Sequence, residues 1–302
     1  MKSHLTEVIS AALSSTAEPE PIDLLHLGRP QVIGAWLLGD VLVDPGPASC
    51  LPALLGALGE RPVRALALTH IHLDHAGAAG SLARRFPELE VWVHERGAPH
   101  LADPSRLLAS ASRLYGTEME RLWGEVLPVP SERIRVLRGG ERLAGLRVAY
   151  TPGHASHHVS YLHEQSGWAF TGDVAGVRIA GGPTMAPTPP PDIDLGAWRG
   201  SIELVRDWQP AALAITHFGA HHDVAAQLDE LAVHLEETED LAARLDEQGF
   251  TATVRERVAA RAGPALAPTY EQAMPPDQSY AGLRRHLERV EVSRKKRAAG
   301  AV

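Results

Sequence analysis

The densest group of chemically active side chains lies in the segment 69–77, which reads THIHLDHAG. Three histidines and one aspartate fall within six consecutive residues of this segment, and imidazole and carboxylate ligands together suit zinc, iron or manganese. Alternate residues of an extended loop share one face, so His70 and His72 point the same way. Asp74 and His75 break this alternation and turn toward a second position. The segment therefore offers ligands for two metal ions.

The elements that must position these side chains are strands. The apolar run 63–68 predicts a buried strand that leads directly into the histidine cluster. Three more metal-type side chains follow predicted strands in the same way: His154 after 146–151, Asp173 after 168–171, and His217 after 211–216. A rigid sheet can aim a side chain that stands at a strand end. One such histidine carries little information, but four such elements in order indicate a composite metal site.

The other elements alternate along the first half of the chain. Strands are predicted at 22–27, 32–38, 41–44 and 89–94, with helices at 51–58 and 76–86. This alternation is typical of a layered α/β fold. The segment 104–126 has helical periodicity, and it either covers the site as a lid or packs on the flank of the fold. The segment 176–194 is rich in glycine and proline, so it predicts a long loop of functional or mobile character.

The motifs, taken together, carry a family resemblance. The cluster HxHxDH at 70–75, Gly-His at 153–154, Gly-Asp at 172–173 and a final His217 resemble the metallo-β-lactamase superfamily of metallohydrolases. This resemblance implies an α/β fold, a four-layer αββα sandwich with the site at one edge of its two sheets. Three regions follow from it: an N-terminal lead-in at 1–21, a catalytic domain at 22–222 and a C-terminal helical extension at 223–302.

The resemblance also gives each side chain a role. It divides the ligands into two sets joined by one aspartate: His70, His72 and His154 for the first metal, Asp74, His75 and His217 for the second, and Asp173 as the bridge. Asp44 matches an aspartate that the family places after an early strand, and its expected role is to fix the loop. Zinc is the first expectation for both metals, with iron or manganese as alternatives.

A two-metal site of this kind predicts hydrolysis. Two divalent cations lower the pKa of a shared water and supply a bridging hydroxide at neutral pH. Asp74 is the residue expected to orient that hydroxide and to carry a proton to the leaving group. The predicted function is a dinuclear hydrolase for a small ester, thioester or lactone. A non-heme iron dioxygenase of the persulfide type and a nuclease or phosphodiesterase of the same fold are the alternatives.

The residues that distinguish the subfamilies of this superfamily do not match the β-lactamase, lactonase, glyoxalase II or flavodiiron pattern. Aspartate stands at 173 where β-lactamases of the superfamily use a cysteine, so antibiotic hydrolysis is not expected. Gly176 replaces the tyrosine of quorum-quenching lactonases, and the residues 174–178 differ from the glyoxalase II pattern. Flavodiiron members place glutamate where His72 stands. The motif therefore predicts that a metal-bound water is activated, and it does not identify the substrate.

Composition limits the partners. The 302 residues carry a formal net charge of −8, which argues against a broad basic face for nucleic acid. The single cysteine, Cys50, excludes an intrachain disulfide and a thiolate-rich metal site and fits a cytoplasmic setting. No secretory signal or membrane span is expected. We predict a small-molecule substrate, no nucleic acid and no membrane, with the C-terminal helices forming either a homodimer face or the rim of the pocket.

Several other side chains invite a functional role. His157 and His158 follow His154, and His158 is expected to form structural hydrogen bonds rather than to bind metal. His221 and His222 either line the substrate pocket or are ordinary exposed residues. Four further side chains are candidates for substrate contact: Tyr115, Trp123 and Trp198 for an apolar pocket wall, and Arg178 just past Asp173. Core packing is the default alternative for the three aromatic residues.

Overall fold

Two six-stranded sheets form the centre of the computed structural model, which describes residues 18–299. The predicted lead-in at 1–21 therefore lies almost entirely outside the described residues. The first sheet has its strands in sequence order: β1 (Glu20–Asp23), β2 (Gly34–Leu38), β3 (Val41–Val43), β4 (Ala65–Ala67), β5 (Glu90–His94) and β6 (Ile134–Leu137). Strands β3 to β6 are parallel to one another, so the carboxyl ends of β4 and β5 lie at the same edge.

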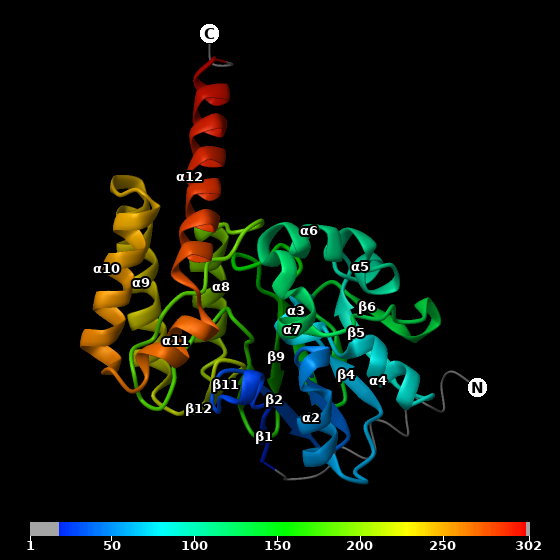
Figure 1. Ribbon diagram of the computed structural model, residues 1–302. Coiled ribbons are helices and arrows are strands. Elements are labelled where there is room, and N and C mark those ends of the chain that lie inside the picture. Colours follow the sequence, from blue (N-terminus) through cyan, green and yellow to red (C-terminus); the bar gives the residue numbers. More distant parts are fainter. Residues whose placement is uncertain (1–17, 300–302) are drawn as a thin grey trace.

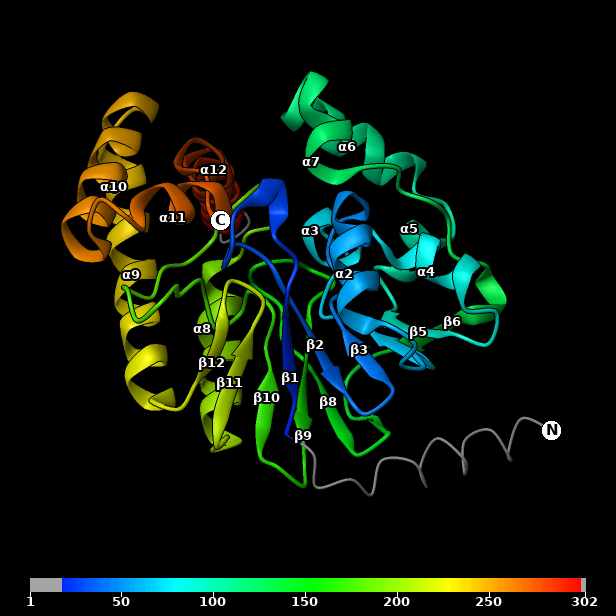
Figure 2. The same ribbon diagram turned by 60° about the horizontal axis from the view of Figure 1, so that its bottom comes forward.

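The second sheet packs against the first, and Figure 2 shows the strands of both side by side. Its strands run in the order β12-β11-β10-β9-β8-β7. Their bounds are β7 (Arg142–Leu143), β8 (Leu146–Tyr150), β9 (Val159–His163), β10 (Trp168–Phe170), β11 (Ala212–Ile215) and β12 (Gly219–His221). The parallel pair β10 and β11 places Asp173 and His217, which follow these strands, at one edge. The central strands therefore deliver the predicted ligands together.

Alternating side chains explain how the layers form. On β3, Val41 and Val43 belong to the core between the two sheets, whereas Leu42 belongs to the core on the outer side of the first sheet. Successive residues of a strand face opposite sides, so a strand that is apolar throughout is buried on both faces. The same pattern holds for Leu66 on β4. The helices α2 (Leu51–Leu58) and α4 (Ala79–Arg85) cover this outer face.

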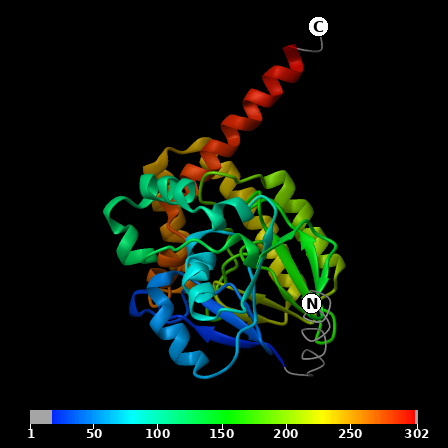
Figure 3. The ribbon, with the colours of Figure 1, turned by 90° about the vertical axis from the view of Figure 1, so that its right-hand side faces the viewer.

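Helices also cover the second sheet. Trp198 and Ile202 of α8 (Leu195–Asp207) and Leu228 of α9 (Val224–Arg244) share a core with Leu213 of β11. The predicted four-layer αββα sandwich is thereby confirmed. Beside it lie the C-terminal helices α10 (Glu247–Ala262), α11 (Ala267–Ala273) and α12 (Pro276–Ala299). The last turns of α12 project from the body of the molecule (Figure 1, Figure 3).

The insertion predicted at 104–126 forms short helices. These are α6 (Ser105–Tyr115), the 3-10 helix η3 (Gly116–Glu118) and α7 (Met119–Trp123), and α5 (Ala98–Ala102) precedes them. Figure 2 shows α6 and α7 on one side and α11 and α12 on the other. Among residues 18–299, no helix combines the length and the apolar character that crossing a bilayer requires.

Two elements differ from the sequence-based predictions. The strand predicted at 22–27 ends at Asp23, because the Asp23 carboxylate accepts hydrogen bonds from the backbone N–H groups of Leu25 and Gln31. Those bonds stabilise a turn that continues into η1 (His26–Gly28). The helix predicted at 76–86 begins later, as α4, and a separate short helix, α3 (Leu73–Ala76), precedes it. The long loop predicted at 176–194 contains no helix and no named strand.

Candidate metal centre

The histidine cluster changes direction inside the loop that follows β4. His70 lies in a loop segment without regular secondary structure, and His72 precedes the first residue of α3 with an extended backbone (φ −60°, ψ 151°). Asp74 and His75 lie within α3, so the helical turn sends them to a different position from His70. The break in alternation seen in the sequence is therefore a short helix.

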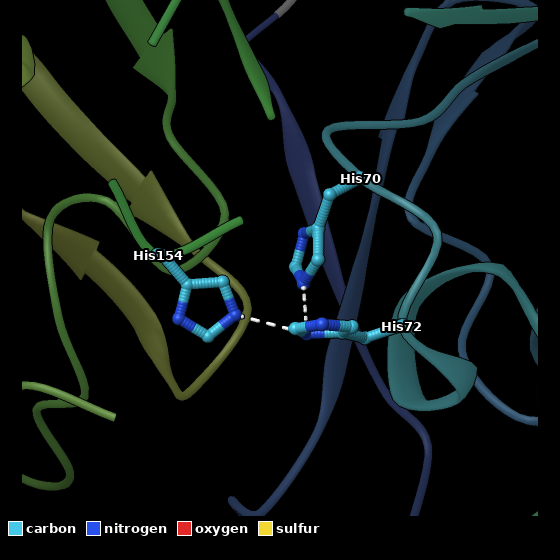
Figure 4. Close-up of side chains that lie close together, drawn as sticks. All are labelled: His70, His72 and His154. Carbon is cyan, nitrogen blue, oxygen red and sulfur yellow. Dashed lines mark hydrogen bonds between the residues drawn. The ribbon is translucent and has the colours of Figure 1, made fainter. Parts of the chain in front are cut away.

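Three imidazole rings converge at one point (Figure 4). The His72 Nδ1 atom lies 3.0 Å from His70 Nε2 and 2.9 Å from His154 Nε2. Burial, reinforced by the neighbouring His154, lowers the pKa of His72 to about 4. Burial also lowers the pKa of both His70 and His154. All three rings are therefore neutral at pH 7, which is the form that binds a metal ion.

A second group lies beside the first and contains Asp74, His75 and His217. The Asp74 Oδ2 atom is 3.4 Å from His217 Nε2 and 3.8 Å from His75 Nε2. Burial disfavours a charge on His75, but the carboxylates of Asp173, Asp74 and Asp44 raise its pKa well above the usual range. This group therefore places two imidazole rings beside a carboxylate, and His75 has to lose a proton before its Nε2 atom can bind a metal ion.

Asp173 lies between the two groups. Its Oδ2 atom is 3.2 Å from His154 Nε2, and its Oδ1 atom is 3.3 Å from His75 Nε2 and 3.7 Å from His217 Nε2. Burial alone would raise the pKa of this carboxyl, yet His75, His154 and His217 hold it well below the usual range. One carboxylate thus presents one oxygen to each group.

The ring nitrogens of His154 and His217 that point away from the centre contact backbone carbonyl oxygens. The Nδ1 atom of His154 lies 2.9 Å from the carbonyl oxygen of Pro187, and the Nδ1 atom of His217 lies 2.6 Å from that of Val32. A neutral imidazole that donates from Nδ1 exposes a lone pair on Nε2. In the neutral form, which is the form that binds a metal ion, each of these rings would therefore direct an acceptor nitrogen at the centre.

Asp44 ties several of these elements together. It has a φ of 47°, a left-handed conformation that aspartate tolerates in a turn. Its carboxylate accepts hydrogen bonds from the backbone N–H of Thr69 at 2.8 Å, the hydroxyl of Thr69 at 2.7 Å and His75 Nδ1 at 2.9 Å. The hydroxyl of Thr216 also donates to it, at 3.2 Å. Asp44 thus fixes residues beside both groups, as its expected loop-fixing role requires.

Two glycines allow the close approach of the ligand loops. Gly172 has a φ of +47°, and a Cβ there would lie 2.4 Å from the Thr69 hydroxyl. Gly153 has a φ of +138°, and a Cβ there would lie 2.3 Å from Trp198 Cα. Glycine is the residue that adopts such conformations without a steric cost. The backbone conformation and the close packing at these two positions therefore explain the glycines of the Gly-Asp and Gly-His motifs.

The donor set fits divalent cations. The buried atoms His75 Nε2 and Asp173 Oδ1 have no hydrogen-bond partner within the described part of the chain, although buried polar atoms normally have one. Three ligand sets have donor atoms within 4.8 Å of one another: His70, His72 and His154; His70, His75 and Asp173; and Asp74, His75 and His217. All seven predicted ligands thus lie together. Their binding of metal stays a prediction.

A cavity of about 400 Å³ opens above the two groups, and His72, Asp74, Asp173 and His217 form its floor. Helices α6, α7, α11 and α12 and the loop 187–191 form its walls. The segment 104–126 therefore covers the site rather than the flank of the fold. Tyr115 and Trp123 line the cavity as predicted, whereas Trp198 is buried in the core of the second sheet.

The other candidate residues do not line this cavity. Arg178 forms a two-pronged ion pair with Asp223, with distances of 2.7 and 2.8 Å, so its predicted substrate contact is not observed. His158 is fully buried, and its Nδ1 lies 3.0 Å from the hydroxyl of Thr151, a structural contact. His221 and His222 lie near the backbone carbonyls of Phe218 and Ala211.

His26 is a cavity residue that sequence reasoning missed. Its ring stacks on Trp123 with 5.6 Å between ring centroids, and its Nε2 lies 3.0 Å from the Leu122 carbonyl oxygen. The Gln272 side chain donates to the backbone carbonyl oxygen of His26 at 2.9 Å. These contacts join η1, α7 and α11, which are far apart in the sequence. No local pattern in the sequence signals them.

Comparisons with known proteins agree with this architecture. The chain is 30% identical over 161 residues to the metallo-beta-lactamase fold-containing protein ST1585 of Sulfurisphaera tokodaii. This alignment covers 51% of this chain and 60% of that protein. It is 40% identical over 101 residues to a hydroxyacylglutathione hydrolase of Hamiltonella defensa, which covers 30% of this chain and 40% of that enzyme. The chain thus spans less than two thirds of either relative.

Solved structures share the fold. The crystal structure of ST1585 from Sulfolobus tokodaii superposes with a TM-score of 0.68 at 22% identity, over 89% of this chain and 99% of that one. The structure of TTHA1623, in a di-iron-bound form, has a TM-score of 0.52 at 26% identity, over 67% of this chain and 94% of that one. The family model of the metallo-beta-lactamase superfamily matches residues 35–221, which is more than half of the chain. The protein therefore belongs to the metallo-beta-lactamase superfamily.

Proposed function

We propose that this protein is a two-metal hydrolase that acts on a small ester or thioester, with lactones as the related class. The observation that carries the proposal is the position of Asp173. One of its oxygens lies 3.2 Å from His154 and the other 3.3 Å from His75. A carboxylate that faces two ligand sets suits a pair of cations better than a single ion.

The ligands divide as the geometry suggests. We infer that His70, His72 and His154 hold one cation, that Asp74, His75 and His217 hold the other, and that Asp173 contacts both. When bound, two divalent cations supply hydroxide from water at neutral pH and polarise a carbonyl oxygen. Nitrogen and oxygen ligands without sulfur suit zinc, iron and manganese, and zinc is our first choice.

Asp74 has the right position to move the proton. Its side chain is 22% exposed, whereas those of Asp173 and His217 are 4% and 2% exposed, and it lines the cavity floor. The His75 and His217 rings hold its pKa below the usual range against the effect of burial, so the carboxylate is ionised at neutral pH. We infer that Asp74 takes the proton released by the attacking water and gives it to the leaving group.

Relatives of known activity support the thioester choice. One relative is named a hydroxyacylglutathione hydrolase and another, 28% identical over 141 residues, an atrochrysone carboxyl ACP thioesterase. Both names describe enzymes that cleave thioesters. Because each alignment covers less than half of the relative, we propose the bond class and not the particular thioester.

A substrate screen tests the proposal. Zinc-, iron- and manganese-loaded protein is assayed on matched esters, thioesters, lactones and phosphodiesters, with oxygen uptake recorded on the iron form. We expect ester or thioester turnover that Asp74→Asn lowers by roughly 10²-fold or more, the contribution typical of general acid–base catalysis. Turnover of phosphodiesters alone, or oxygen uptake without hydrolysis, would overturn the assignment in favour of a nuclease or an iron dioxygenase.

A further inference from the structure

The cavity has three chemically distinct levels. Its floor carries the polar side chains of the metal centre. Most of the residues that line the space above the floor are apolar, among them Leu73, Leu107, Leu122, Trp123 and the prolines 187 and 189–191. A volume of about 400 Å³ suits a small organic ligand, since such pockets measure roughly 300–1,000 Å³. An apolar segment of the substrate therefore fits between the floor and the opening.

Two arginines form the third level. Arg113 on α6 and Arg285 on α12 line the cavity and are both exposed, which places them at its open end. Within the described part of the chain, neither has an ion-pair partner within 4.0 Å or a side-chain hydrogen bond, whereas Arg121 nearby on α7 pairs with Glu118. Two arginine side chains at the opening are therefore available to a ligand.

The two arginines lie on helices that meet across the opening. The hydroxyl of Tyr115, two residues after Arg113, donates to the Gln278 side chain of α12 at 3.3 Å. Both residues also line the cavity. This contact joins the insertion to the C-terminal helices above the metal centre. The positive charges of α6 and α12 are thus presented to the same opening.

We propose that the substrate carries an anionic group, separated from the scissile bond by an apolar segment, and that Arg113 and Arg285 bind this anion. The inference rests on the proposed hydrolase function and names its substrate class. A guanidinium group donates two parallel hydrogen bonds to a carboxylate or a phosphate, which a neutral chain end cannot accept. Binding energy from a remote part of the substrate then contributes to catalysis at the reacting bond.

Matched substrates test the inference. The nitrophenyl monoester of octanedioic acid is compared with nitrophenyl octanoate, and acetylated hydroxyoctanoic acid with octyl acetate, so that the carboxylate stands on the acyl or the alcohol side. We expect kcat/KM to be roughly tenfold higher for the anionic member of at least one pair, as charged hydrogen bonds of this strength allow. A phosphate-ended chain of equal length distinguishes phosphate from carboxylate recognition. Equal kcat/KM within both pairs would overturn the inference.

Variants assign the effect to the two side chains. In Arg113→Gln, Arg285→Gln and the double variant we expect the preference for the anion to fall stepwise, roughly to unity in the double variant. Arg106→Gln on α6 and Lys296→Gln on α12 are the controls, because both residues are exposed and neither lines the cavity. An unchanged preference in the double variant would contradict the assignment.

A binding measurement separates this inference from the hydrolase proposal. Calorimetry compares the monoamide of octanedioic acid with octanamide, two probes with an unreactive amide in place of the ester. Tighter binding of the anionic amide to the wild type, lost in the double variant, supports the arginine site even if no ester is cleaved. Equal affinities would overturn the site even if the protein proves to be an esterase.

Discussion

At the candidate metal centre, His154, His217 and His75 each direct one ring nitrogen to a hydrogen-bond acceptor of the protein and the other to the centre. The cavity above it is instead lined mainly by apolar side chains, many of them from α6 and α7. The ligands stand at the ends of buried strands, but α6 has no buried residue. A few contacts, such as the stack of His26 on Trp123, hold the walls together. We therefore propose that the sheets fix the chemistry of the site and that the walls, which form a separate set of contacts, select the substrate.

Removing the bridging carboxylate has the largest expected effect on the first region. In Asp173→Ala we expect bound metal to fall from two ions per chain to one or none. Hydrolysis should drop by at least about 10³-fold, because the charge stabilisation of several kcal/mol from the metals is lost. Metal analysis and steady-state kinetics measure both. Asp207→Ala, at an exposed site near the end of α8, is the control. Two metals and full activity in Asp173→Ala would refute the site assignment.

A substitution at Asp44 tests whether the hydrogen bonds that orient the predicted ligands matter as much as the ligands themselves. Asp44→Asn keeps the shape of the side chain but removes the charge that His75 and both Thr69 groups contact. We expect metal affinity to fall by about 10–100-fold, the usual loss when a group that orients a metal ligand is changed. Competition with a metal chelator measures this affinity. Affinity equal to that of the control Asp207→Asn would show that Asp44 does not orient the site.

Trp123 tests the independence of the cavity wall. Its side chain packs against both His26 and Tyr115, with ring centroids 5.6 and 5.0 Å away. We expect Trp123→Ala to lower the free energy of unfolding by about 2–3 kcal/mol, somewhat less than for an aromatic residue enclosed on all sides. Urea denaturation measures that change, and kinetics should show a raised KM. Loss of either metal in this variant would contradict the separation of walls from chemistry.

Tyr115 gives the smallest expected effect. Tyr115→Phe removes only the hydroxyl that donates to Gln278 across the opening. The free energy of unfolding should fall by about 1 kcal/mol or less, because a single partly exposed hydrogen bond contributes little. We expect a change in KM of less than about fivefold and an unaltered metal content. A large fall in kcat would mean that the hydroxyl acts on the reacting bond, and the wall interpretation would then fail.

The same contrast explains what the sequence predicts and what it leaves out. The grouping of the seven predicted ligands is predictable because each follows an apolar strand, and some have a recognisable neighbour, such as Gly153 before His154. Even the break in alternation at Asp74 is visible in the sequence. The sandwich follows from strands that are apolar on both faces, such as 41–43 and 65–67.

The cavity wall is less predictable because it depends on contacts between distant segments. His26 lies within an apolar stretch that reads as a strand, and only the Asp23 carboxylate reveals the turn. The pairing of Arg178 with Asp223 removes a candidate substrate contact, and nothing local announces it. The homodimer expected through the C-terminal helices stays a prediction, as do the residues assigned as ligands.

The most direct test of the central claim is the number and position of metal ions in the purified, metal-loaded protein. Metal analysis combined with anomalous X-ray diffraction measures both. The proposal predicts two cations per chain, one among His70, His72 and His154 and the other among Asp74, His75 and His217. A single ion, ions bound elsewhere, or no metal after loading would contradict it.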